Sequence, residues 1–255
     1  MSLLIINADD FGYSEGINYG IIDSFKNGIL TSTTLMANMP GFDHAVKLAK
    51  ENPELGIGVH LTLTCDQPVL DSHRTIVDEQ NFFNKLYFYE GKFSIDYEEL
   101  YREWKAQIEK VIHAGIKPTH LDSHHHVNTI PGITEVFVKL AEEYDLPVRG
   151  NFNVPGHLIT CDRFFNNFDG LGLDKDIWKM MTDRNLVEDC LNYKTVEVMC
   201  HPGYVDAELL DRFSFTDGRP YICRELQEKK YKKLFAEKNI KLGTYHEIMV
   251  SPVSC

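Results

Sequence analysis

The chain has 255 residues, of which 43% are hydrophobic and 25% are charged, as is typical of a folded globular protein. Its formal net charge is −12. This excess of acidic residues argues against an extensive nucleic-acid surface, which needs clustered Lys and Arg to neutralise phosphate. It also disfavours docking on anionic lipid. We therefore expect neither a nucleic-acid partner nor a membrane partner.

The N-terminal stretch and the cysteines favour a cytoplasmic protein. The sequence begins MSLLIINADD, whose apolar run is too short for a signal peptide or a membrane span, and we interpret it as a buried strand. The six cysteines include no CxxC pair and are too widely spaced to form a disulfide framework. We expect reduced thiols.

Short apolar runs alternate with amphipathic segments along the chain. Strands are predicted at residues 3–8, 29–38, 55–64, 116–123, 146–152, 195–203 and 240–248. Helices are predicted, from apolar residues at helical spacing and from Gly or Pro stops, at residues 15–28, 42–53, 95–115, 132–145, 174–186 and 223–239. Repeated βα units of this kind indicate a parallel sheet.

The fold class follows from this alternation. Residues 7–12 lack the G-x-G-x-x-G that a dinucleotide-binding fold places after its first strand. We therefore predict an α/β fold in which residues 1–255 form a single-domain, irregular TIM-like (β/α) barrel with about seven parallel strands. Residues 65–95 resist assignment, and residues 153–175 form another long connection. We expect the first to be a long insertion that serves as a binding loop, a peripheral subdomain or a dimer contact.

Acids, histidines and one arginine follow the predicted strands. Functional residues of an α/β barrel lie at the carboxyl ends of its strands, so these side chains should face one another across one cleft. They are Asp9, Asp10, His60, the group from Asp122 to His126, Arg149 and His201. Each is a weak signal alone, but together they predict an active site. Elsewhere, His73 is expected in solvent and His120 in a structural position.

One carboxylate with two imidazoles suits a catalytic divalent metal, because this set leaves coordination positions open for water and substrate. In the stretch DSHHHV, the side chains of a continuing strand would alternate, so Asp122, His124 and His126 would share a face while His125 points away. His124 lies nearest the strand and is the first choice as ligand. His126 is the second choice, or a substrate contact, and Asp122 is placed to orient a ligand imidazole.

Five blocks of sequence identify a resemblance. NADDFG, NGILTSTTLMAN, GVHLTLT, KPTHLDSHHHV and HPGY occur in this order over nearly the whole chain. With these blocks, the sequence resembles the YdjC-like carbohydrate deacetylases, a family that includes chitooligosaccharide deacetylases. It departs from the common family pattern HHHVH by having Asn128 at the last position. The segment 65–95 and the stretch after Asn151 also match less well, and these regions are expected to shape substrate choice.

The resemblance implies a function and a set of roles. It implies an irregular TIM-like barrel that removes acetyl from N-acetylated mono- or oligosaccharides. Members of the family are often dimeric, so a homodimer is one expectation here. One divalent metal ion, Mg²⁺ or Zn²⁺, would be held by Asp10, His60 and His124. Asp9 would be the base that takes a proton from water, by analogy with polysaccharide deacetylases that use a paired Asp after the first strand.

Two further roles and two alternatives complete the prediction. His201 is the candidate acid for the leaving amine, and Arg149 is expected either to hold Asp9 ionised or to form a surface ion pair. A two-metal phosphoesterase stays open because of His125 and His126. A non-catalytic sugar-binding protein also stays open. In either an enzyme or a binding protein, sugar rings could stack on the aromatic residues Phe82, Phe83, Tyr87, Phe88 and Tyr89.

Overall fold

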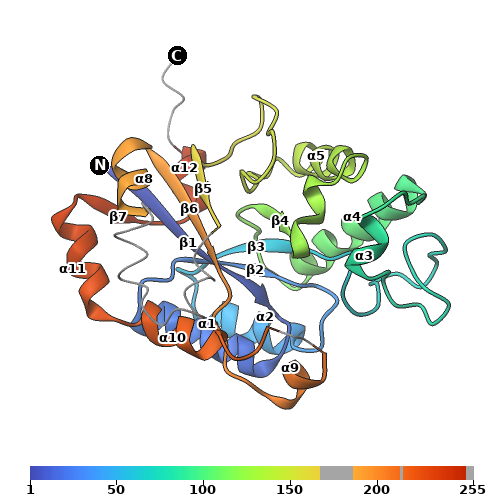
Figure 1. Ribbon diagram of the computed structural model, residues 1–255, viewed down its shortest axis with the longest axis horizontal. Coiled ribbons are helices and arrows are strands. Elements are labelled where there is room, and N and C mark those ends of the chain that lie inside the picture. The colour runs from blue at the N-terminus through green and yellow to red at the C-terminus, as the bar shows by residue number, and fades with distance from the viewer. Residues whose placement is uncertain (167–185, 213–214, 251–255) are drawn as a thin grey trace.

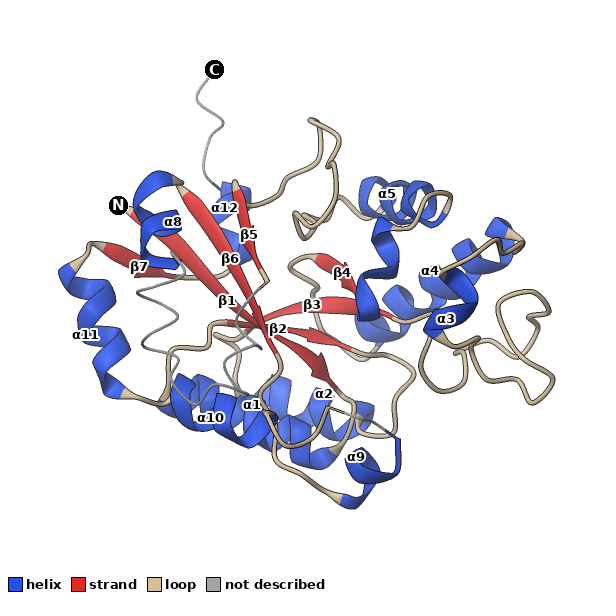
Figure 2. Ribbon diagram, viewed as in Figure 1, coloured by secondary structure: helices blue, strands red, loops and turns tan. Residues whose placement is uncertain are grey.

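A curled parallel sheet organises the fold, with strand β1 at its centre (Figures 1 and 2). The computed structural model describes residues 1–166, 186–212 and 215–250. Within these residues the strands are β1 (Ser2–Phe11), β2 (Ser32–Leu35), β3 (Gly56–Leu61), β4 (Leu121–Ser123), β5 (Arg163–Phe165), β6 (Thr195–Cys200) and β7 (Ile240–Leu242). They follow the order β4-β3-β2-β1-β6-β5, with β7 paired to β1, and every pairing is parallel.

Strand β1 has three partners because the sheet branches along it. One edge pairs with β6 from Leu3 to Ala8. On the other edge, its first residues pair with β7 and its last residues with β2. Leu4, Ile5, Ile6 and Ala8 are fully buried, as expected for a parallel strand that is covered on both faces. The apolar N-terminal run is therefore the core strand that the sequence predicts.

The sheet is a half-barrel rather than a closed barrel, and this agrees with the predicted irregular TIM-like class. It ends at β4 on one side and at β5 on the other. The strand predicted at 146–152 is wrong, because only Val148 makes an isolated parallel bridge to Leu121. Instead β5 lies inside the connection 153–175. Pro147 has no N–H to extend a ladder beside β4, which explains the short pairing there.

Helices cover the sheet, and α1 packs between α2 and α10 while α4 and α5 lie side by side (Figure 1). Their bounds are α1 (Glu15–Asn27), α2 (Phe42–Glu51), α3 (Leu86–Tyr89), α4 (Tyr97–His113), α5 (Ile133–Glu143), α8 (Leu186–Asn192), α9 (Ala207–Arg212), α10 (Arg219–Leu226), α11 (Lys229–Glu237) and α12 (Tyr245–Val250). A segment with 3-10 turns, η1, spans His124–Thr129 and is interrupted by non-helical backbone at His125 and His126. None of the described helices is long and apolar enough to cross a membrane.

The first four predicted helices are confirmed, and α4 shows which local signals predict a helix. Its N-cap Asp96 accepts a hydrogen bond from the Glu98 N–H, as capping residues do. Its apolar stripe of Leu100, Trp104, Ile108 and Val111 is fully buried. The helix predicted at 223–239 is divided into α10 and α11, and the one predicted at 174–186 falls almost wholly outside the described residues.

The strand predicted at 240–248 is correct only in its first residues. It ends at Leu242, and α12 follows. Thr244 caps that helix, because its N–H and its hydroxyl both donate to Glu247 Oε2 at 2.7 Å and its Oγ1 accepts from the His246 N–H at 3.3 Å. The contact with Glu247 is one half of the Thr-x-x-Glu capping box, a local signal in the sequence that was missed.

The segment 65–95 is largely irregular and is attached to α4 by buried acids. Glu103 accepts hydrogen bonds from the backbone N–H groups of Val69 and Leu70, and lies 2.9 Å from His73 Nε2. His73 is therefore buried rather than in solvent, because Glu103 gives its imidazole a charged partner. Farther along, Phe83 and Tyr89 are also buried. These two rings pack in the core, so they are not available to stack on a sugar.

Candidate active site

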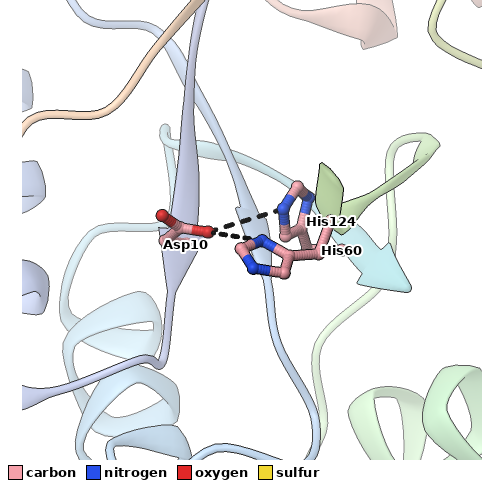
Figure 3. Close-up of side chains that lie close together, drawn as sticks. All are labelled: Asp10, His60 and His124. Atoms are coloured by element: carbon pink, nitrogen blue, oxygen red, sulfur yellow. Dashed lines mark ion pairs between the residues drawn. The ribbon is translucent and has the colours of Figure 1, made fainter. Parts of the chain in front are cut away.

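Three side chains from distant parts of the sequence meet at the carboxyl edge of the sheet. Figure 3 shows Asp10 from β1, His60 from β3 and His124 after β4 pointing toward one another. Asp10 Oδ1 lies 3.5 Å from His60 Nε2 and 3.1 Å from His124 Nδ1. All three residues are at least 98% buried. Their ligand atoms lie within 4.8 Å of one another, which is close enough for one ion to contact all three.

A distortion at the end of β1 lets two adjacent acids serve one site. In a regular strand Asp9 and Asp10 would point to opposite faces. The pairing of β1 with β2 shifts register between Ala8 and Phe11, and Asp10 has a φ of 71°. Left-handed backbone at a non-glycine residue is strained, and such strain is concentrated at functional sites. Here it places both carboxylates close to His60.

The hydrogen bonds of His60 suit a metal ligand. Its Nδ1 lies 2.7 Å from Asp122 Oδ1, so the carboxylate holds a proton on Nδ1 and leaves the lone pair of Nε2 free. That Nε2 is buried, and no described residue gives it a hydrogen bond. A carboxylate that orients a ligating imidazole in this way is the common second layer of metal sites. One oxygen and two nitrogens also match the donor preference of several divalent metals. The group therefore fits a divalent metal.

Arg149 binds Asp9, the neighbour of the candidate ligand Asp10, in the interior of the protein. Its two terminal nitrogens each donate to one oxygen of Asp9 at 2.7 Å. It also lies 2.9 Å from Asp122 and donates to Glu197 at 2.9 Å. Arg149 is fully buried, so the alternative of a surface ion pair is wrong. The planar guanidinium donates hydrogen bonds from three nitrogens in fixed directions and can therefore bind several carboxylates at once, whereas an ammonium group has one nitrogen.

The neighbours of these groups shift their pKa values in the direction opposite to the effect of burial. Burial alone would raise the pKa of Asp9, but the charge and hydrogen bonds of Arg149 hold it well below its ordinary value. Burial would lower the pKa of His60 and of His124, but Asp122 acts on His60 and Asp10 on His124 so that both are raised. Carboxylates thus favour positive charge at the place where the ligand atoms meet.

Arg219 is a site residue that the sequence reasoning missed. Its Nη2 lies 2.7 Å from Asp10 Oδ2, and its Nε donates to the carbonyl of Phe215. The residue is fully buried at the start of α10. Each acid of the Asp9–Asp10 pair thus has its own arginine. No local pattern announces this role, because Arg219 lies more than two hundred positions from Asp10 and only the tertiary fold joins them.

The three histidines do not continue β4 as a strand. The strand ends at Ser123, and the backbone then turns with φ of 55° at His125 and 54° at His126. The predicted alternation of side chains after Ser123 is therefore wrong. Because of these turns, His124, His125 and His126 all line the same cavity. The Nδ1 of His125 is 2.9 Å from Thr64 Oγ1 and that of His126 is 3.0 Å from Asn151 Nδ2.

A cavity of about 240 Å³ opens over the site. Asp9, His60, His124 and His201 are among the residues that line it. His201 follows β6 and is partly exposed, with its Nε2 3.8 Å from Asp9 Oδ2. The structure thus gathers Asp9, Asp10, His60, His124, Arg149 and His201 around one site, with Arg149 behind Asp9.

A second set of potential metal ligands lies near the cavity, and it already contacts a positively charged side chain. Asp9, His60 and Asp122 also present atoms within 4.8 Å of one another. The guanidinium of Arg149 contacts both of these carboxylates. Its fixed positive charge opposes a second metal ion there, because two cations a few ångströms apart in a buried site repel strongly. The arrangement favours one metal ion rather than two.

The curled parallel sheet and the buried Asp/His/His group define a barrel-like α/β protein with a candidate metal centre at its carboxyl edge. Comparison with known proteins agrees with the resemblance found in the sequence. Residues 3–237 match the family model of the YdjC-like proteins. The chain belongs to the YdjC-like family.

Similar proteins match over almost their whole length. A carbohydrate deacetylase of Geobacillus stearothermophilus is 43% identical over 244 residues, which cover 95% of this chain and 96% of the relative. A carbohydrate deacetylase of Clostridium beijerinckii is 40% identical over 250 residues, with coverage of 96% and 99%. Among solved structures, a "putative cellobiose-phosphate cleavage protein" of Enterococcus faecalis V583 has a TM-score of 0.87 at 32% identity, covering 96% of this chain and 98% of that one.

Proposed function

We propose that this protein is a metal-dependent hydrolase that removes the acetyl group from N-acetylated mono- or oligosaccharides. The observation that supports it best is the Asp10, His60 and His124 group beside an ionised Asp9, under one cavity. Relatives named carbohydrate deacetylases, which match 95–96% of this chain, supply the substrate class.

The metal ligands proposed are Asp10 Oδ1, His60 Nε2 and His124 Nδ1. A divalent cation at this position, Mg²⁺ or Zn²⁺, would polarise water and the acetamide carbonyl and so lower the barrier to hydrolysis. Asp122 fixes the tautomer of His60 through the bond to Nδ1. Arg219 holds the other oxygen of Asp10. The chain's own contribution is therefore to fix the ligand atoms before the substrate binds.

Asp9 is proposed as the base that accepts a proton from the attacking water. The bidentate contact with Arg149 orients this carboxylate and keeps it ionised over the whole neutral range. The same contact makes Asp9 weakly basic, so the water must be acidified for the transfer to be efficient. This requirement explains why the base lies beside the proposed metal ligands.

His201 is proposed as the acid that protonates the leaving amine. An amine leaves poorly unless it carries a proton, so a donor must reach its nitrogen. His201 lines the cavity directly after the end of β6, which pairs with β1, and its Nε2 is 3.8 Å from Asp9 Oδ2. This distance would let a proton pass between the two residues through the substrate or one water.

The experiment that tests the proposal is an acetate-release screen over a panel of N-acetylated saccharides, with Mg²⁺, Zn²⁺ or chelator present. Acetate release that depends on metal supports it. Release of phosphate from sugar phosphates, with a metal-to-protein ratio near two, would favour a phosphoesterase instead. Tight sugar binding with no acetate released under any metal would favour a non-catalytic binding protein.

Three secondary proposals accompany this function. We propose a cytoplasmic location, because the described cysteines, Cys65, Cys161, Cys190, Cys200 and Cys223, form no disulfide with one another. We also propose that residues 1–255 act as one deacetylase-like domain with an insertion at 65–95, and that the protein is a homodimer. Light scattering after size-exclusion chromatography measures the oligomeric state, and a monomeric mass would contradict the last of these.

A further inference from the structure

A chain of hydrogen bonds runs from the end of β4 to His126, which follows the proposed metal ligand His124 by two positions. The backbone N–H of Asn128 donates to Ser123 Oγ at 3.0 Å, and Ser123 Oγ is 2.8 Å from Asn128 Oδ1. Asn128 Nδ2 is 2.8 Å from Asn151 Oδ1. Asn151 Nδ2 is 3.0 Å from His126 Nδ1. Ser123 and Asn128 are buried.

The direction of every bond in this chain follows from its first member. A backbone N–H can only donate, so Ser123 Oγ accepts at that position. Among the described residues, the acceptor for the hydroxyl hydrogen of Ser123 is the Asn128 amide, so the near atom of that amide is its oxygen. The other end of Asn128 is then the NH₂ group, which donates to the oxygen of Asn151. Asn151 therefore turns its own NH₂ group toward His126.

This direction determines the tautomer of His126. An imidazole nitrogen that accepts a hydrogen bond carries no proton, so Nδ1 is bare and the proton of the neutral ring lies on Nε2. His126 lines the cavity, and its left-handed backbone turns it there together with His124. The hydrogen-bonding atom that its side chain has left for a ligand is the Nε2–H donor.

We propose that Ser123, Asn128 and Asn151 hold His126 as an Nε2–H donor that recognises an acceptor oxygen of the bound substrate, a hydroxyl or carbonyl oxygen of the acetylated sugar. The nature of that substrate rests on the proposed function, whereas the tautomer does not. His126 is then a substrate-binding residue rather than a metal ligand. Asn128 and Asn151 are positioning residues that act through it.

Such a donor would contribute to specificity. A site that is built to donate one hydrogen bond discriminates against an analogue without the matching oxygen, because the bound analogue covers the half-buried donor and gives it no partner. Sugars that differ only in whether they bear a hydroxyl at one position would be separated in this way. The role of His126 would be seen in KM more than in kcat.

The tautomer can be measured directly by NMR. In protein with ¹⁵N-labelled histidine, loaded with Zn²⁺ or Mg²⁺ at pH 7.5, the signals of His126 are assigned by their loss in His126→Gln. A bare Nδ1 and a protonated Nε2 are expected. A proton on Nδ1 in the wild-type protein would overturn the inference, whether or not the protein releases acetate.

A matched pair of variants tests the positioning chain. Asn151→Asp replaces the donor beside Nδ1 with an acceptor, so Nδ1 should gain a proton. Asn153→Asp makes the same chemical change two residues away, at an exposed side chain, and should leave the spectrum of His126 unchanged. If Asn151→Asp also leaves Nδ1 bare, the chain does not set the tautomer.

Substrate binding supplies the second readout. His126→Leu removes the donor and should raise KM for the best saccharide of the screen about three- to tenfold, the value of one neutral hydrogen bond, with kcat changed less than about twofold. His126→Gln retains an N–H group near the position of Nε2 and should restore KM toward the wild-type value. Titration calorimetry with the same sugar gives the parallel change in Kd without turnover. An unchanged KM and Kd in His126→Leu would overturn the proposed contact.

Discussion

Replacement of Arg149 by Lys tests the idea that a planar guanidinium, and not merely a positive charge, holds the acids of the site. Arg149 makes four contacts with Asp9, Asp122 and Glu197, using three nitrogens at 2.7 to 2.9 Å. A lysine has one nitrogen on a single stem. It therefore cannot remain within hydrogen-bond distance of all three carboxylates, and we expect at least two contacts to be lost.

The magnitude follows from these lost contacts. A hydrogen bond to a charged group contributes about 1.5–3 kcal/mol, so Arg149→Lys should lower the free energy of unfolding by about 3–6 kcal/mol. For a chain of this size, each kcal/mol corresponds to about 2–4 °C in Tm, so a fall of about 6–24 °C is expected. The buried carboxylates left without a partner add to this loss.

The assay is thermal unfolding followed by circular dichroism, with Arg163→Lys as the matched control. Arg163 also pairs with a carboxylate, Asp189, at 2.8 Å, but its side chain is 47% exposed. Exposed pairs contribute only about 0–1 kcal/mol, so this variant should melt close to the wild type. If the two substitutions lowered Tm by the same small amount, the buried network would not have the role assigned to Arg149.

Three further predictions concern the acid, the metal and the 65–95 segment. Asp9→Asn should reduce kcat for acetate release about 10²–10⁴-fold with metal content unchanged, and near-wild-type activity in that variant would remove Asp9 as the base. Arg149 lowers the pKa of Asp9 in the folded protein below the value of about 3.9 that an aspartate has in the unfolded chain. The ionised carboxylate therefore stabilises the fold at every pH above about 3.9. This stabilisation is lost as the pH falls toward the pKa of Asp9 in the folded protein. The difference in unfolding free energy between wild type and Asp9→Asn should thus be equal at pH 7 and pH 5 and shrink only below about pH 4, as urea titrations can measure. His60→Ala and His124→Ala should each lose bound metal in elemental analysis, and full metal content in both would contradict the proposed ligands. Glu103→Gln should lower the unfolding free energy by about 1.5–3 kcal/mol and speed proteolysis within 65–95, and equal Tm and cleavage rates would show that Glu103 does not anchor this segment.

Much of the fold could be predicted because its signals are local. The buried run of β1 and the capped, amphipathic helix α4 can each be recognised from fewer than twenty consecutive residues. The alternation of strands and helices follows when such segments are read in order along the chain. The errors arose where tertiary context decides the local shape. Residues 146–152 contain apolar side chains but find only one bridge, and the 163–165 strand is too short to be recognised.

Part of the site could be predicted for a different reason. Parallel strands bring their carboxyl ends to one edge, so Asp10, His60 and His124 could be placed together without coordinates. The direction of the side chains after Ser123 could not, because two left-handed residues interrupt the strand. The departure at Asn128 was visible in the sequence, but its link through Asn151 to His126 was not.

The sequence by itself determined that this is a parallel α/β protein of the YdjC-like family, with acids and histidines at one edge of its sheet. These features depend on periodicity and on motifs, which are properties of neighbouring residues. Only the tertiary structure decided that Arg149 and Arg219 are buried and that each takes one acid of the Asp9–Asp10 pair. The physical reason is that an arginine is charged in every context, and whether it lies at the surface or inside depends on carboxylates that the fold brings from distant positions in the chain.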